Sequence, residues 1–169
     1  MTHASLHRFL SSLAAAALLL LTHAVGGAEA QTASLPPHTF ELDGRRLVIE
    51  LPPRAAIRVA PDGKHARIDV RPSTRQPIAI TLRPLLEGEA AKGFDRTETL
   101  GGSRILSYRV STANAGSGGP EAFLDGRLTL GDRPYVVTCH AQGDSITKDD
   151  AAWCLPYLST LTATEAEAK

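Results

Sequence analysis

The sequence predicts an α+β domain in which a mainly antiparallel β-sheet carries one or two helices packed on one face. Three observations support this fold class. Apolar and polar residues alternate with a period of two in several short segments that end at glycine or proline, as in half-buried strands. Near the C-terminus the apolar spacing changes to that of a helix. Two cysteines, Cys139 and Cys154, can tie this C-terminal helix to the sheet by a disulfide.

Strands are expected wherever the period of two continues between turn residues. These segments are 38–43, 46–51, 54–60, 66–70, 78–82, 94–100, 104–111, 121–130 and 134–141. Asp43-Gly44 and Gly101-Gly102 are predicted to form the turns of two hairpins. A short helix is predicted over Pro84–Lys92, since proline suits the first helical position and Gly93 follows the end.

The C-terminal helix is predicted from its first turn and its apolar stripe. Thr147 can cap the N-terminus, and Asp149 and Asp150 suit the positive end of the helix dipole. Pro156 is expected to kink the helix or to split it in two, because proline lacks an amide hydrogen. The stripe follows the spacing i, i+4, i+5 and i+8 and consists of Trp153, Tyr157, Leu158 and Leu161.

The first 30 residues are predicted to be a secretory signal peptide. Arg8 gives a weakly basic start, Leu10 to Leu21 is an apolar run, and Ala28-Glu29-Ala30 has the small residues that signal peptidase requires. The apolar run of about a dozen residues is shorter than the roughly 20 that span a bilayer. We therefore expect cleavage after Ala30 and a soluble periplasmic product without a membrane span.

The remaining chain is predicted to be one domain over residues 31–161, followed by a disordered tail over 162–169. The 18 Lys and Arg of the whole chain balance its 18 Asp and Glu, so a nucleic-acid partner is not expected. The balance is uneven: residues 31–110 carry 13 cations and 9 anions, whereas residues 111–169 carry 4 and 8. Either these two parts attract each other within one fold, or the C-terminal loops form an acidic face.

An even number of cysteines in an exported chain indicates a disulfide. A redox pair would have two intervening residues, whereas Cys139 and Cys154 are 15 positions apart. His140 beside Cys139 could bind copper if the cysteine were free, but no further ligand lies at the close spacing that metal sites use. We expect a structural disulfide that stabilises the fold by roughly 3 kcal/mol, and neither a metal nor a cofactor.

One segment bears on catalysis. Gly116-Ser117-Gly118-Gly119-Pro120 resembles the Gly-Asp-Ser-Gly-Gly-Pro segment around the nucleophile of chymotrypsin-like serine proteases, but Gly116 replaces the aspartate. That mechanism needs a histidine base and a buried aspartate, and neither His38 nor His65 has the sequence context of such a base. The mature chain is also too short for two barrels. We therefore predict a flexible glycine-rich loop, no catalytic residues and no enzymatic activity.

Arginine is the main cation of the mature chain. Arg67, Arg71 and Arg75 share strand parity or lie just beyond the strand, so they could form a cationic stripe for phosphate or for an acidic partner. The alternative is an ordinary solvated strand face.

The layout resembles PsbP-like domains and the small periplasmic immunity proteins that protect bacteria from type VI secretion effectors. The residues that carry the resemblance are Leu51-Pro52-Pro53, Ser117-Gly118-Gly119, Tyr135 to Cys139 and Trp153-Cys154-Leu155. The resemblance implies a non-catalytic protein that binds and neutralises a partner, a peptidoglycan-cutting toxin. The alternative function is a periplasmic carrier of a small ligand or lipid, in which sheet and helix enclose an apolar pocket.

A partner-binding surface is expected at the small-residue loop over Ser111 to Glu121, since loops on a rigid scaffold often carry recognition. Its glycines would let the backbone approach a partner closely, and nearby carboxylates would speed encounter with a cationic groove. The alternative is a long hairpin connection without function. The candidate partner-binding residues are Ser117, Gly118, Gly119, Glu121, Asp125 and Asp144.

Overall fold

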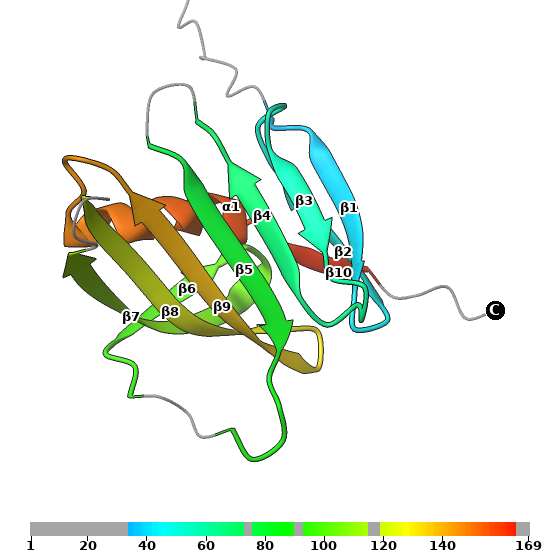
Figure 1. The fold of residues 1–169 in the computed structure, drawn as a ribbon. Coiled ribbons are helices and arrows are strands. Elements are labelled where there is room, and N and C mark those ends of the chain that lie inside the picture. Colours follow the sequence, from blue (N-terminus) through cyan, green and yellow to red (C-terminus); the bar gives the residue numbers. More distant parts are fainter. Residues whose placement is uncertain (1–33, 73–75, 90–92, 115–118, 165–169) are drawn as a thin grey trace, which may run out of the picture. The chain divides into compact units, whose positions relative to one another are not determined.

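The computed structural model describes residues 34–72, 76–89, 93–114 and 119–164, and nearly all of its regular structure is β-strand. The strands form two antiparallel sheets, where the sequence indicated one (Figure 1). The smaller sheet has the order β1-β2-β10, and the larger has the order β3-β4-β5-β9-β8-β7-β6.

The smaller sheet begins with the predicted hairpin. Strands β1 (Pro37–Leu42) and β2 (Arg45–Glu50) pair around Asp43 and Gly44, whose φ angles of 52° and 71° are those of a tight two-residue turn. Strand β10 (Thr162–Thr164) pairs with the other edge of β2. The first three residues of the expected disordered tail are therefore a strand, because β2 offers them backbone hydrogen-bond partners. Residues 165–169 lie outside the described part of the chain.

The larger sheet is antiparallel throughout. After β5 the chain crosses to the far edge at β6 and returns strand by strand, so that β9 pairs with β5. The strands are β3 (Ala56–Val59), β4 (Ala66–Val70), β5 (Ile78–Pro84), β6 (Arg96–Leu100), β7 (Arg104–Asn114), β8 (Pro120–Leu130) and β9 (Arg133–Gln142). A 3₁₀ turn, η1 (Gly101–Ser103), closes the predicted β6–β7 hairpin.

The predicted helix over Pro84–Lys92 is wrong for its described residues. Pro84 is the last residue of β5, and the backbone amide of Glu89 closes a turn onto the carbonyl oxygen of Leu86 at 3.1 Å. Gly88 has a φ of 78°, a left-handed conformation that interrupts a helix. Residues 90–92 lie outside the described part.

The C-terminal helix is split, as expected, into the 3₁₀ helix η3 (Lys148–Cys154) and the single-turn α1 (Leu155–Leu158). Pro156 lies in the first turn of α1, where a missing amide hydrogen costs no helical bond. The Asp150 carboxylate accepts hydrogen bonds from the backbone N–H of Thr147 at 2.5 Å and from its hydroxyl at 2.9 Å. This contact stabilises the N-terminus of η3.

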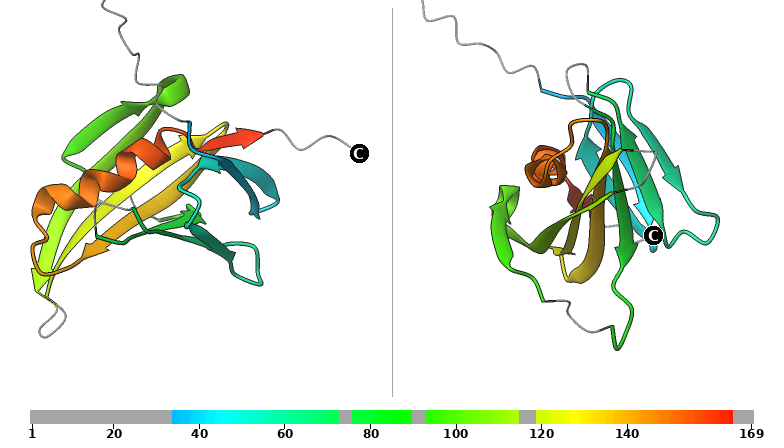
Figure 2. Two further views of the ribbon diagram at one scale, coloured as in Figure 1. Left: turned by 90° about the horizontal axis from the view of Figure 1, so that it is seen from above. Right: turned by 60° about the vertical axis from the view of Figure 1, so that its left-hand side comes forward.

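The helical segment packs on one face of the larger sheet, here called the inner face (Figures 1 and 2). Alternate residues of β4, β5, β7, β8 and β9 are buried there, together with apolar residues of the smaller sheet, in one core. The predicted disulfide between Cys139 on β9 and Cys154 on η3 is present, with a Cα–Cα distance of 6.3 Å. It holds the helical segment against the sheet. The largest fully buried side chains include Leu42, Leu47, Ile49, Ile68, Ile80, Leu82, Leu106, Leu124, Leu128 and Tyr135.

Candidate functional site

The opposite face of the larger sheet, here called the outer face, is the candidate site. Because side chains alternate along a strand, the neighbours of the buried residues all point to this side. Strand register brings them together in rows that cross the sheet. One row consists of Ala56, Asp69, Ala79, His140, Phe123 and Ser111, and the next consists of Arg58, Arg67, Thr81, Thr138, Asp125 and Arg109.

Arginines gather at the β3–β4 end of the outer face. Arg58 on β3 lies directly opposite Arg67 on β4, and both donate hydrogen bonds to the carboxylate of Asp69, from Arg67 Nε at 2.8 Å. Arg54 and Arg71 lie at the other end of this hairpin and are exposed. We call Arg54, Arg58, Arg67 and Arg71 the arginine cluster. The cluster therefore combines two arginines that hold one carboxylate with two exposed arginines.

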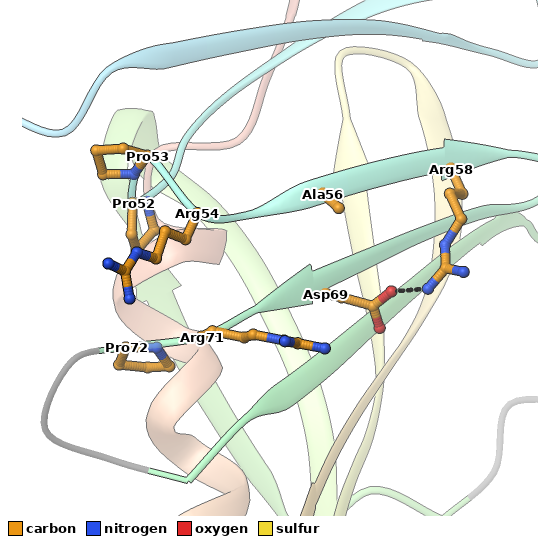
Figure 3. Close-up of a pocket in the computed structure, with 8 residues that line it drawn as sticks. All are labelled: Pro52, Pro53, Arg54, Ala56, Arg58, Asp69, Arg71 and Pro72. Carbon is orange, nitrogen blue, oxygen red and sulfur yellow. Dashed lines mark hydrogen bonds and ion pairs between the residues drawn. The ribbon is translucent and has the colours of Figure 1, made fainter.

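A hollow of about 900 Å³, open to solvent, runs through the arginine cluster. In Figure 3 the side chains of Arg58 and Arg71 reach toward Asp69 from opposite sides. Pro52, Pro53 and Pro72 border the hollow. Its chemistry suits an anionic group.

Asp69 has a lowered pKa. Partial burial raises the pKa of its carboxyl, but the hydrogen bonds from Arg58 and Arg67 outweigh that effect, and their positive charges add to the lowering. Asp69 is therefore ionised at neutral pH and orients both guanidinium groups.

A second hollow continues from Arg67 and Asp69 across β5 to His140 on β9. The imidazole of His140 stacks on Phe123, with ring centroids 4.7 Å apart and planes inclined by 13°. Its Nε2 lies 3.3 Å from Glu121 Oε1, although the approach lacks hydrogen-bond geometry. Because side chains alternate along β9, His140 points to the outer face, whereas its neighbour Cys139 is buried on the inner face.

The structure describes four of the six predicted partner-binding residues. Gly119 and Asp144 are neighbours, since a Cβ on Gly119 would lie 3.7 Å from Asp144 Oδ1. Glu121 and Asp125 follow on β8 and share the outer face. Ser117 and Gly118 lie outside the described residues, so the prediction that Ser117 is not part of a catalytic set stays a prediction.

Two of the carboxylates at this end lie beside basic side chains of the same protein. Asp125 lies 3.6 Å from Arg109 and accepts a hydrogen bond from Thr138 at 3.3 Å. Glu121 faces His140. Asp144 is exposed.

A family model for the type six secretion immunity 3 (Tsi3) domain matches residues 48–162. The matched range contains the arginine cluster, the outer face and both cysteines. The chain belongs to the Tsi3 family. The expected resemblance to type VI secretion immunity proteins is thereby confirmed.

Two other comparisons add little to the Tsi3 match. No curated protein matches the chain significantly. A crystal structure from Bacteroides thetaiotaomicron VPI-5482 aligns with 73% of the chain at 10% identity and a TM-score of 0.45. The Tsi3 chain spans 47% of the length of that protein.

Two features are absent from the described residues, a membrane-spanning helix and a cluster of metal ligands. No helix among them is long and apolar enough to cross a membrane. Nor do three or more His, Cys, Asp or Glu side chains in this part of the Tsi3 domain come close enough together to hold a metal ion.

Sequence reasoning named only part of this site. It singled out Arg67, Arg71 and Arg75, of which the first two belong to the arginine cluster and Arg75 is not described. It missed the contribution of Arg58. A signal for Arg58 was available, since residues 58 and 67 are nearly equidistant from the turn at Pro61-Asp62-Gly63 and so face each other in a hairpin.

Proposed function

We propose that this Tsi3-family protein is exported to the periplasm and there binds and neutralises a peptidoglycan-degrading effector. The observation that carries the proposal is the family match over the disulfide-bonded domain. Export is supported by the predicted signal peptide over residues 1–30 and by the disulfide, because disulfides persist in oxidising compartments. Neutralisation is stoichiometric, by binding and without catalysis.

The contact surface includes the end of the sheet at which Gly119, Glu121 and Asp144 meet, together with Ser117, Gly118 and Asp125. Three glycines over residues 116–119 support close backbone approach by a partner. The exposed Asp144 is the strongest acidic contributor, since Glu121 and Asp125 already face cations of this protein.

The test of the function uses the product purified from the periplasm of cells that express the full chain, and the effector encoded beside this gene. N-terminal sequencing is expected to find Gln31 as the first residue. An equimolar amount of the protein is expected to stop the effector from solubilising purified peptidoglycan. A product that retains residues 1–30 contradicts the export proposal, and binding without inhibition contradicts neutralisation.

Deletion of residues 114–119 tests the loop separately. The deletion is expected to weaken effector binding by several-fold while cooperative thermal unfolding persists. Unchanged affinity in the folded variant removes the loop from the interface.

A further inference from the structure

The arginine cluster is not required by the fold. Arg58 and Arg67 lie directly opposite each other across the β3–β4 pair, and like charges in that position destabilise a sheet. The same cross-strand row shows the contrast at its other end, where Asp125 on β8 lies opposite Arg109 on β7. One end of the row therefore pairs opposite charges, and the other juxtaposes equal ones.

Asp69 compensates only part of this charge. It accepts hydrogen bonds from Arg58 and Arg67, whereas Arg54 and Arg71 make neither a hydrogen bond nor an ion pair among the described residues. Arg54, Arg58 and Arg71 line the open hollow together with Asp69, which leaves an excess of two positive charges there, and Arg67 adds a further cation in the adjoining hollow. The chain as a whole has no excess of cations, so this concentration is local.

The backbone around the hollow also needs no rearrangement to bind an anionic group. Its walls are two hydrogen-bonded strands, and Pro52, Pro53 and Pro72 restrict the backbone where the chain enters and leaves them. Asp69 holds two of the guanidinium groups in place. A preorganised surface loses less conformational entropy on binding, and the planar guanidinium matches a carboxylate through two parallel hydrogen bonds.

We propose that the arginine cluster is a docking surface for a carboxylate-rich patch on the effector protein. This inference rests on the proposed function, because it takes the effector as the partner. Arg54 and Arg71 bind carboxylates of the effector directly, and Asp69 positions Arg58 and Arg67 beside them. The recognition is by charge complementarity, so it speeds association and weakens as salt rises.

The first experiment compares two double charge reversals of equal size. Arg54→Glu/Arg71→Glu alters two exposed arginines that make neither a hydrogen bond nor an ion pair among the described residues, so the fold should be retained. Lys64→Glu/Lys148→Glu is the matched control, since both lysines are exposed and lie outside the hollow. Affinity for the effector is measured at low and at physiological ionic strength.

The arginine variant is expected to lose roughly tenfold or more in affinity at low salt, mainly through slower association. Its remaining binding should depend less on salt than that of the wild type. The control is expected to stay within about twofold of the wild type. If both variants bind equally well, the arginine cluster is not a docking surface, although the immunity function stands.

A second measurement does not depend on the effector. Arginine Nε–Hε signals of the ¹⁵N-labelled protein are followed by NMR while a polyglutamate peptide is added, with inorganic phosphate in a parallel titration. Shifts at Arg54 and Arg71 with the peptide are expected. Absence of such shifts overturns the inference, as does an equal response to phosphate at the same charge concentration. An effector that fails to bind the wild type while these shifts occur contradicts the proposed function and the effector as the occupant, and leaves only the carboxylate binding of the arginine cluster.

Discussion

The two faces of the larger sheet differ in what a substitution can do. On the inner face, Leu124 and Tyr135 are fully buried, and the Cys139–Cys154 disulfide ties the helical segment to the sheet. On the outer face, side chains such as Asp69 and Thr138 stay partly accessible and contact one another through charge and hydrogen bonds. Substitutions on the inner face should therefore change stability, whereas the outer face is available for recognition.

The largest expected effect comes from truncating the inner face. Leu124→Ala removes a fully buried side chain at the middle of β8, opposite Cys139, and leaves a cavity. The free energy of unfolding should fall by about 2–5 kcal/mol, measured by urea denaturation. Ile105→Ala is the control, because Ile105 is 56% exposed and its loss should cost far less. Equal losses in the two variants would break the distinction between core and surface.

Removal of the disulfide should have the next largest effect. The double variant Cys139→Ser/Cys154→Ser is expected to lose about 3 kcal/mol, because the bond closes a loop of 15 residues and restricts the unfolded chain. Thermal unfolding of the oxidised wild type and the variant measures this loss. Hydrogen exchange should rise first in η3 and α1. A rise of equal size in the β3–β4 hairpin would show that the disulfide supports the arginine cluster too.

Tyr135→Phe tests a polar atom on the inner face. The hydroxyl of Tyr135 is buried without a hydrogen-bond partner in the described structure, and burial raises the pKa of the phenol. Replacement by Phe is expected to leave stability unchanged or to raise it by about 1 kcal/mol, since an unsatisfied buried hydroxyl is unfavourable. A clear loss of stability in urea denaturation would mean that the hydroxyl is satisfied in solution.

The smallest effect is expected on the outer face, at Asp69. Because its folded-state pKa is lowered, the ionised carboxylate contributes stability above the unfolded pKa, and this contribution is lost as pH falls through the folded value. Asp69→Asn should therefore cost no more than about 1 kcal/mol at neutral pH, and the difference from wild type should begin to shrink below about pH 4, the unfolded pKa, and vanish only once the pH is below the lowered folded pKa. Urea midpoints across the acid range measure it. A difference that persists at low pH would assign the effect to packing.

Local signals in the sequence were sufficient for several elements. Asp43-Gly44 predicts its hairpin, because both residues tolerate positive φ and the flanking residues alternate. Thr147 and Asp150 mark the start of η3, and Pro156 divides the helical segment. In each of these the residues that decide the structure are only a few positions apart.

Other features were missed because they depend on distant residues. The turn at Leu86–Glu89 replaces a predicted helix, since the pairing of β5 with β9 extends through Pro84. Strand β10 exists only because β2 lies beside it. The fold also brings Arg109 to Asp125 and His140 to Glu121 from other strands, which the sequence did not indicate.

The sequence by itself determined most of the strands, the two hairpin turns and the disulfide partners, because residue spacing, turn chemistry and two cysteines specify them. Only the tertiary structure decided the strand order and the charge pattern of the outer face. A period of two shows that Arg58 and Arg67 each point away from the core, but not what lies beside them. Their neighbours are set by register and by the return of β9 to β5, which result from packing of segments far apart in the chain.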